Sequence, residues 1–203
     1  MSVIAVNGSP HVDGNTATAI GIIAGELQLH EIDTEVVQIG QLTIKGCTAC
    51  RGCAGGKGCV IADSLNDITA KMRAADGIII GSPVYYAGIN GTVKSFLDRA
   101  FFSSGSGFRL KPAAAVVAAR RAGTTPALEQ INRYFALAEM LVTPTVYWSG
   151  IHGRDAGEAE RDLEGVSMLK QLGTNMAYLI QLQRKSSVPL PDKIDKVMFN
   201  YIR

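Results

Sequence analysis

The sequence predicts an α/β fold, in which a parallel sheet is covered by helices on both faces. Short apolar segments alternate five times with segments of helical periodicity. Residues 77–80 and 113–119 are apolar almost throughout, as is typical of strands buried on both faces. The chain has 203 residues, 47% hydrophobic and 19% charged, which is enough for one compact core. We expect one domain over residues 1–185 and an extended tail over 186–203.

The expected strands are five short segments rich in β-branched and apolar residues. They cover residues 2–7, 34–39, 77–80, 113–119 and 145–148. The third is expected to end at the turn sequence Gly81-Ser82-Pro83.

The expected helices follow from apolar residues that recur at spacings of three and four. They lie around residues 20–27, 65–72, 93–100, 128–138 and 160–182. Residues 43–62 have neither period and are rich in glycine and cysteine, so we expect a long loop there. Asp98 and Arg99, adjacent in the sequence, are expected to form a structural pair at a helix end.

The charge balance excludes two classes of partner. Twenty Lys and Arg against eighteen Asp and Glu give a formal charge of +2, without the basic excess of a nucleic-acid-binding protein. No apolar segment approaches the length of a membrane helix, and the first residues do not resemble a signal peptide. We therefore expect a cytoplasmic protein with no nucleic-acid or membrane partner.

The loop after the first strand, residues 8–16, has the features of an anion-binding turn. Ser9, Asn15 and Thr16 supply polar side chains just before a helix, and the amino end of a helix attracts anions. This favours a phosphate group, although the carboxylate of Asp13 would oppose it. The alternative is an ordinary turn in which Asn15 caps the helix.

The loops after the third and fourth strands carry aromatic and basic residues. Tyr85 and Tyr86 would form a flat wall suited to a planar aromatic ligand, or alternatively a contact between subunits. Arg120 or Arg121 would neutralise a negative charge, or alternatively lie in solvent. In open α/β sheets, ligands bind at the carboxyl ends of the strands, where all three loops are expected.

Three segments together resemble a known family: GSPHVDGNT, SPVYYAGINGTVKSFLDR and GEAERDLEGVSMLKQLGTNMAYLI. They are similar to the flavodoxin-like NAD(P)H-dependent FMN reductases, and in particular to the iron–sulfur flavoprotein branch. The resemblance covers residues 1–185 and implies a doubly wound five-stranded sheet of order 2-1-3-4-5, bound FMN, and NAD(P)H as electron donor.

The resemblance also implies which residues bind FMN. Its phosphate would be held by Ser9, His11, Asn15 and Thr16, and its isoalloxazine ring would be lined by Pro83, Val84, Tyr85 and Tyr86. Segment 119–124, which includes Arg120 and Gly123, would close the other side of the ring. The family often has Arg or Lys where this chain has His11, which would weaken phosphate binding or make it depend on pH.

All four cysteines lie in the long loop, in the pattern Cys47-x2-Cys50-x2-Cys53-x5-Cys59. Three cysteines at this spacing are typical of an iron–sulfur cluster, and the fourth would complete a [4Fe–4S] site. Three alternatives remain open, namely a structural zinc, a redox dithiol, or a loop that holds no metal.

These observations predict an FMN-dependent NAD(P)H oxidoreductase or electron-transfer flavoprotein. The flavin would perform the chemistry without a catalytic side chain, and the cluster would relay electrons to a small-molecule or protein acceptor. The alternative is a non-catalytic, redox-sensing binding module that uses the cysteine loop. Phe101, Phe102 and the tail suggest contacts between subunits, so we expect a homodimer or homotetramer.

Overall fold

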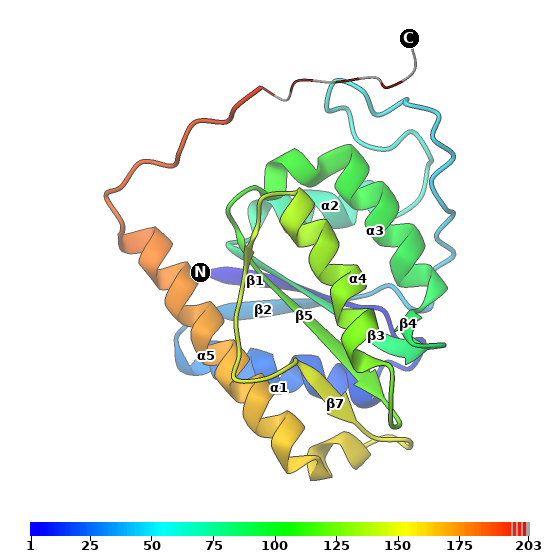
Figure 1. Ribbon diagram of the computed structural model, residues 1–203, viewed down its shortest axis with the longest axis vertical. Coiled ribbons are helices and arrows are strands. Elements are labelled where there is room, and N and C mark those ends of the chain that lie inside the picture. The colour runs from blue at the N-terminus through cyan, green and yellow to red at the C-terminus, as the bar shows by residue number, and fades with distance from the viewer. Residues whose placement is uncertain (196, 198, 200, 202–203) are drawn as a thin grey trace.

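The computed structural model has three layers, with a mainly parallel sheet between two layers of helices (Figure 1). The structure describes residues 1–195, 197, 199 and 201. The main path of the sheet is β2-β1-β3-β5-β6, β4 pairs antiparallel with β3, and β7 pairs with β5. The strands are β1 Ser2–Asn7, β2 Asp33–Gln38, β3 Gly77–Tyr85, β4 Gly88–Ile89, β5 Pro112–Ala119, β6 Leu141–Val142 and β7 Gly150–His152. The predicted flavodoxin-like fold class is confirmed.

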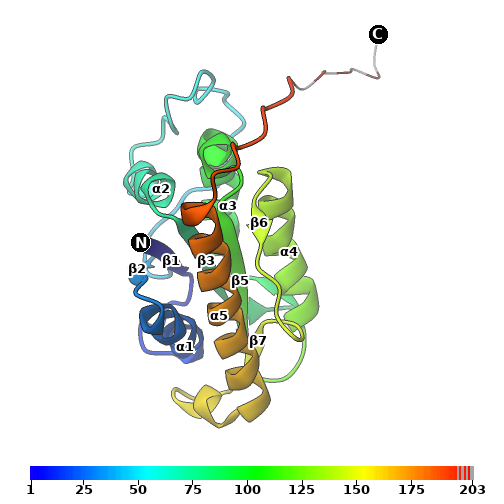
Figure 2. The same ribbon diagram turned by 90° about the vertical axis from the view of Figure 1, so that its left-hand side faces the viewer.

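The helices divide between the two faces of the sheet. One face is covered by α1 (Asn15–Leu29) and α5 (Leu163–Lys185), and Figure 2 shows α5 running along the sheet. The other is covered by α2 (Leu65–Ala74), α3 (Gly91–Ser104) and α4 (Thr124–Leu137). Two short 3₁₀ helices, Gly105–Phe108 and Glu158–Arg161, complete the set. Strand side chains alternate between the faces, so Ile78 and Ile80 enter one core and Ile79 enters the other.

The third strand is longer than predicted, because it continues through Pro83 to Tyr85. Its neighbour β1 ends at Asn7, which lies opposite Gly81. β3 still pairs with β5 as far as Pro83, which lies opposite Ala118, and Val84 and Tyr85 pair with β4. The strand therefore carries Pro83, Val84 and Tyr85 beyond the end of β1.

The predicted strand at 145–148 is wrong. β6 pairs with the beginning of β5 and β7 with its end, and the segment between them leaves the sheet. There the Ser149 hydroxyl donates to the carbonyl of Ala115 at 2.7 Å. Tyr147 and Trp148 are exposed and pack edge to face, with ring centroids 4.3 Å apart. The composition of residues 145–148 favours a strand, but the Ala115 carbonyl, with which a strand here would pair, accepts a hydrogen bond from the Ser149 side chain.

The long loop is confirmed, since residues 39–64 contain turns but no helix or strand. The described part of the tail beyond Lys185 also has neither, and Arg109 donates to the carbonyl of Pro191 at 2.8 Å. The rest of the predicted tail, residues 196, 198, 200, 202 and 203, lies outside the described residues. None of the described helices combines the length and hydropathy needed to cross a bilayer.

Candidate functional site

A cleft of about 450 Å³ opens at the carboxyl ends of β1, β3 and β5. The chain order of the strands reverses between β1 and β3, which is the position where open α/β sheets bind ligands. All three loops singled out in the sequence meet here. The lining consists of Ser9, His11, Asp13, Gly14, Asn15, Thr16, Pro83, Val84, Tyr85, Ala118, Ala119, Arg120, Gly153, Arg154, Asp155 and Ala156.

The first loop is organised by its own side chains. The Asn7 amide oxygen accepts from the Ser9 N–H at 3.0 Å, and the Ser9 hydroxyl accepts from the His11 N–H at 3.1 Å. The helix cap is Gly14, which has no side chain to occupy the first N–H groups of α1. The alternative that Asn15 caps the helix is therefore wrong. An uncapped helix end that faces a cleft is suited to an anion.

Neighbouring segments hold this loop in place. Asn90 donates to the Gly8 carbonyl at 2.6 Å and accepts from the Val93 N–H at 2.9 Å, so it links the loop to the start of α3. On the other side, the Gln38 amide donates to the Ser9 carbonyl. Gly40 approaches so closely that an added Cβ would lie 1.9 Å from that carbonyl oxygen. The loop is thus fixed from both sides.

The second loop is a tight hairpin between β3 and β4. Tyr86 and Ala87 form its two-residue turn with φ values of 48° and 59°, a left-handed conformation that side chains disfavour. Tyr85 lines the cleft, whereas Tyr86 stands fully exposed at the tip of the turn and does not. Gly123 also lies outside the lining. Gly123 supports the hairpin by close contact, because a Cβ added at this position would lie 2.7 Å from the Ala87 Cα.

Sequence reasoning missed the fourth part of the lining, residues 153–156. This segment follows β7, so the rule that selected the other loops applies to it too. It was missed because the last strand was predicted at 145–148. The Asn15 amide oxygen accepts from the Ala159 N–H at 3.2 Å, which links this segment to the first loop.

Asp162 anchors the same region next to the cleft. It accepts from the Gly165 N–H at 2.9 Å at the start of α5, and its Oδ2 lies 3.0 Å from Nδ1 of His152. Burial opposes ionisation of Asp162, but the bonds from Gly165 and from the His152 backbone lower its pKa.

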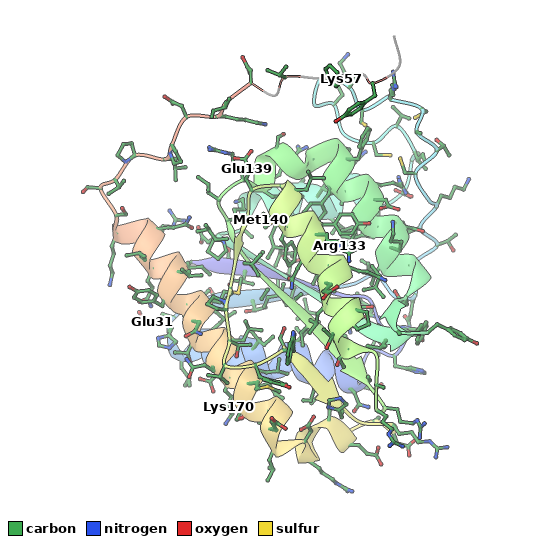
Figure 3. All side chains as sticks on the ribbon, viewed as in Figure 1. Glu31, Lys57, Arg133, Glu139, Met140 and Lys170 are labelled. Carbon is green, nitrogen blue, oxygen red and sulfur yellow. The ribbon has the colours of Figure 1, made fainter. Side chains whose placement is uncertain are left out.

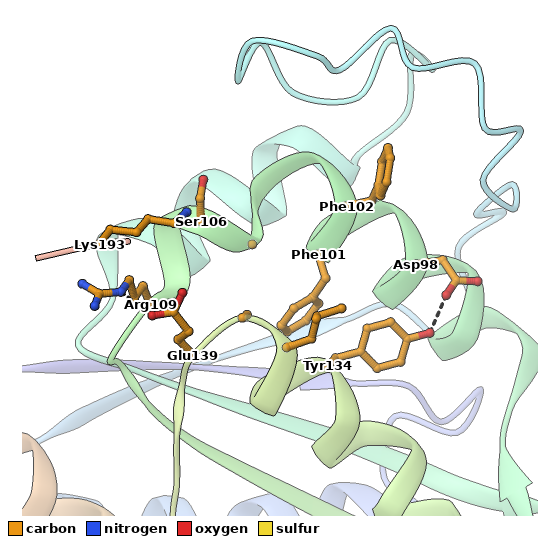
Figure 4. A pocket seen from close by; sticks show the side chains of 11 residues that line it. Asp98, Phe101, Phe102, Ser106, Arg109, Tyr134, Glu139 and Lys193 are labelled. Atoms are coloured by element: carbon orange, nitrogen blue, oxygen red, sulfur yellow. Dashed lines mark hydrogen bonds and ion pairs between the residues drawn. The ribbon is translucent and has the colours of Figure 1, made fainter. Parts of the chain in front are cut away.

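A second cavity, of about 360 Å³, lies between α3 and α4 (Figure 4). Its wall includes Phe101, Leu137 and Tyr134, whose hydroxyl donates to Asp98. Asp98 also accepts from Lys94 at 2.6 Å. The predicted pair of Asp98 and Arg99 is therefore wrong, because adjacent residues on a helix point in different directions. Asp98 is half-buried beside this cavity, whereas Arg99 is fully buried.

The four cysteines line a single narrow cavity together with Arg99. None of them forms a disulfide. Within the described part of the chain, no three His, Cys, Asp or Glu side chains lie close enough to hold one metal ion. The Gly52 N–H and the Thr48 hydroxyl lower the pKa of the Cys50 thiol. Four thiols are the donor set that a [4Fe–4S] cluster requires, so the residue types fit such a cluster, and the segment that carries them would have to close around it.

The sheet order, with the turn after β1 leading directly into α1, defines the flavodoxin-like class. Residues 1–154 match the model of the NADPH-dependent FMN reductase family. The chain therefore belongs to this family, which is a family of FMN-binding oxidoreductases, and the predicted resemblance is confirmed.

Known relatives agree with this assignment. An iron–sulfur flavoprotein of Methanocaldococcus jannaschii is 31% identical over 194 residues, covering 91% of this chain and 100% of the relative. One from Methanosarcina thermophila is 27% identical, covering 92% and 98%. Among solved structures, RosB has a TM-score of 0.74 at 13% identity, covering 100% of this chain and 92% of RosB. An NADH:FMN oxidoreductase has a TM-score of 0.61 at 18% identity, covering 93% and 91%. These two structures support the fold alone.

Proposed function

We propose that this protein takes electrons from NADH or NADPH onto FMN and passes them to a small-molecule or protein acceptor through a [4Fe–4S] cluster. The observation that carries the flavin part is the convergence of three loops on one cleft at the carboxyl ends of the strands. Bound FMN accepts electrons in pairs and releases them singly or in pairs. The protein has to bind the flavin, orient it and tune its potential.

The cleft residues divide this work by their chemistry. Ser9, His11, Asn15 and Thr16 surround the open end of α1 and are suited to a phosphate. Pro83, Val84 and Tyr85 form a largely apolar wall suited to the flavin ring. Arg120 and Arg154 add positive charge to the lining, against the carboxylates of Asp13 and Asp155.

The cysteine loop supplies the second redox site in this proposal. The cysteines line a cavity next to Arg99 and Phe102 in the second half of α3, and this cavity shares no lining residue with the cleft. Cys47, Cys50, Cys53 and Cys59 would bind the cluster, and the iron–sulfur flavoprotein names of the relatives support this role. The predicted homodimer or homotetramer and the cytoplasmic location stay predictions.

The test is anaerobic purification followed by visible spectroscopy, iron and sulfide analysis, and titration with NADH and NADPH. We expect a flavin spectrum that bleaches with at least one nicotinamide, and four irons per chain as required by a [4Fe–4S] cluster. Cys50→Ser should lose iron and keep FMN. Lys57→Ala, at an exposed position of the same loop, should keep both.

Each component of the proposal has its own contradicting result. A flavin that neither nicotinamide bleaches would exclude the proposed donor. Absence of iron after anaerobic reconstitution would exclude the cluster. A protein that stays colourless when FMN is supplied would contradict the flavin site and favour the redox-sensing binding module.

A further inference from the structure

We infer that Arg99 is the positioning residue of the cysteine loop. It fixes Cys59 as the one preformed ligand, around which Cys47, Cys50 and Cys53 close on the cluster. This inference rests on the proposed function, because it concerns how the chain holds the cluster proposed there.

Arg99 is a buried charge whose hydrogen bonds all go to the cysteine loop and its flanks. It projects from α3 with 1% of its side chain exposed, and such a charge is costly to bury unless it is paired and fully bonded. Asp63 pairs with both terminal nitrogens, at 2.5 and 3.0 Å. The same nitrogens donate to the carbonyls of Lys45 at 3.2 Å and Ile61 at 3.4 Å. One side chain thus binds the loop both before its first cysteine and after its last.

Cys59 is held by its side chain and by its backbone. Nε and Nη2 of Arg99 both point at its sulfur, at 3.3 and 3.2 Å. Asn66 on α2 accepts from the Cys59 N–H at 2.9 Å and donates to its carbonyl at 2.8 Å. The preceding Gly58 permits this approach, because it has a φ of 79° and a Cβ there would lie 2.9 Å from the Asn66 oxygen. The position of the Cys59 sulfur is therefore set by Arg99 on α3 and by Asn66 on α2.

The segment that carries the other three cysteines has much weaker support. Cys47 and Cys50 are exposed, and Cys53 is half-buried. In the described structure, the backbone of residues 47–58 makes only two backbone–backbone hydrogen bonds, from Ala54 to Arg51 and from Gly56 to Cys53. Ala49 and Arg51 also have left-handed backbone conformations that side chains disfavour. This segment can change shape around a ligand, whereas Cys59 already stands in place.

The two N–H groups aimed at Cys59 have a further consequence for a bound cluster. Hydrogen bonds to ligand sulfur and a nearby cation favour the more negative, reduced state of a cluster, so they raise its reduction potential. A lysine would keep the positive charge but not the planar fork that reaches Cys59, Asp63 and two carbonyls together. Arg99→Lys therefore separates the positioning role from the charge.

The experiment compares the reconstituted wild-type holoprotein with Arg99→Lys and with a matched control, Arg133→Lys. Arg133 is exposed on α4 (Figure 3), where it lies 3.5 Å from Glu129, and it lines neither of the cavities that contain cysteines. We expect Arg99→Lys to lose iron to a chelator about 10–100-fold faster than wild type. Its cluster potential should shift to a more negative value, while its FMN content and spectrum stay unchanged. The control should match wild type in every measurement.

A second variant keeps the inference testable if Arg99→Lys folds poorly. Asn66→Ala releases the Cys59 backbone without changing any charge, and should speed iron loss while leaving the potential close to that of wild type. In the apoprotein, both variants should increase amide hydrogen exchange across residues 45–63.

Three results would overturn the inference, and they differ from failure of the proposed function. Equal iron retention and equal potential in Arg99→Lys and wild type would show that Arg99 only supports the fold. Unchanged iron loss in Asn66→Ala would show that Cys59 is not the anchored ligand. If wild type itself takes up no iron and sulfide, the proposed cluster is wrong and the inference falls with it, while flavin bleaching would leave the flavin function standing.

Discussion

The proposed flavin cleft and the cysteine loop position their residues in opposite ways. The cleft is lined by the ends of β3 and β5, the start of α1 and the loops beside them, and its first loop is held from both sides by Asn90 and by Gln38 and Gly40. The cysteine loop has no helix or strand, and three of its thiols lie on a glycine-rich segment. Arg99 and Asn66 hold Cys59 and the two flanks of the loop, but not the segment that carries the other three thiols.

This difference separates two kinds of preorganisation. A site built on strand ends has its shape before the ligand arrives, and this lowers the entropic cost of binding. A loop anchored at one ligand reaches its final shape only when the ligand binds. Changes to the supports of the cleft should therefore alter flavin affinity, whereas changes to the supports of the loop should alter folding stability and iron retention.

The largest expected effect is on stability, from Asp63→Ala. This change leaves the buried guanidinium of Arg99 without its carboxylate, and breaking such a pair costs about 3 kcal/mol of unfolding free energy. Flavin affinity should stay at the wild-type value, since Asp63 lies outside the cleft. Urea denaturation of the apoprotein and an FMN titration measure the two quantities.

Glu35→Ala is the matched control for the loss of unfolding free energy in Asp63→Ala. Glu35 pairs with Lys71 at 2.5 Å, but both side chains are more than half exposed, and exposed pairs contribute less than about 1 kcal/mol. Equal destabilisation by the two variants would contradict the structural role assigned to the buried pair.

The next effect, on flavin affinity, is expected from Gly40→Ala. The new Cβ would collide with the Ser9 carbonyl and displace the loop after β1, which is proposed to bind the FMN phosphate. Overpacking of this kind costs about 1–3 kcal/mol. If this cost reduces the free energy of FMN binding, the FMN dissociation constant rises about 10–100-fold. Iron content should not change.

Gly21→Ala is the control for this substitution. Gly21 lies in α1 with no atom within 4 Å of an added Cβ, so alanine should stabilise the helix by about 0.5–1 kcal/mol and leave FMN affinity unchanged. If Gly40→Ala lowers the iron content while FMN still binds with wild-type affinity, the cleft and the cysteine loop do not have separate supports.

The same contrast explains what the sequence was able to predict. The strands of the main core were found because runs such as residues 77–80 are apolar throughout. The position of the cleft followed because parallel strands expose their carboxyl ends at one edge. The partner of Arg99 was not predictable, since Asp63 lies 36 residues away in sequence and only tertiary packing joins them. The orientation of Tyr86 depends likewise on the register of the hairpin, which local composition does not specify.

A smaller effect is expected from His11→Arg in the cleft. An arginine keeps its charge at every physiological pH, whereas imidazole is charged only in more acidic solution. If position 11 faces the FMN phosphate, the arginine variant should bind FMN about 3–10-fold more tightly than wild type at pH 8. Fluorescence titration of the two proteins at pH 8 measures this, and equal dissociation constants would remove His11 from the phosphate site.

The smallest expected effect is the change with pH in the stability that the Asp63–Arg99 pair contributes. The hydrogen bonds from Arg99 hold the pKa of the Asp63 carboxyl below its ordinary value. A carboxyl with a lowered folded-state pKa contributes its full stability above the unfolded-state pKa of about 3.9, and that stability is lost as the pH falls through the folded-state value. The stability gap between wild type and Asp63→Asn should therefore be constant near neutral pH and narrow below about pH 4. Urea denaturation of both apoproteins at a series of pH values measures the gap, and a gap that persists undiminished in strong acid would show that an ionised Asp63 is not what holds Arg99 in place.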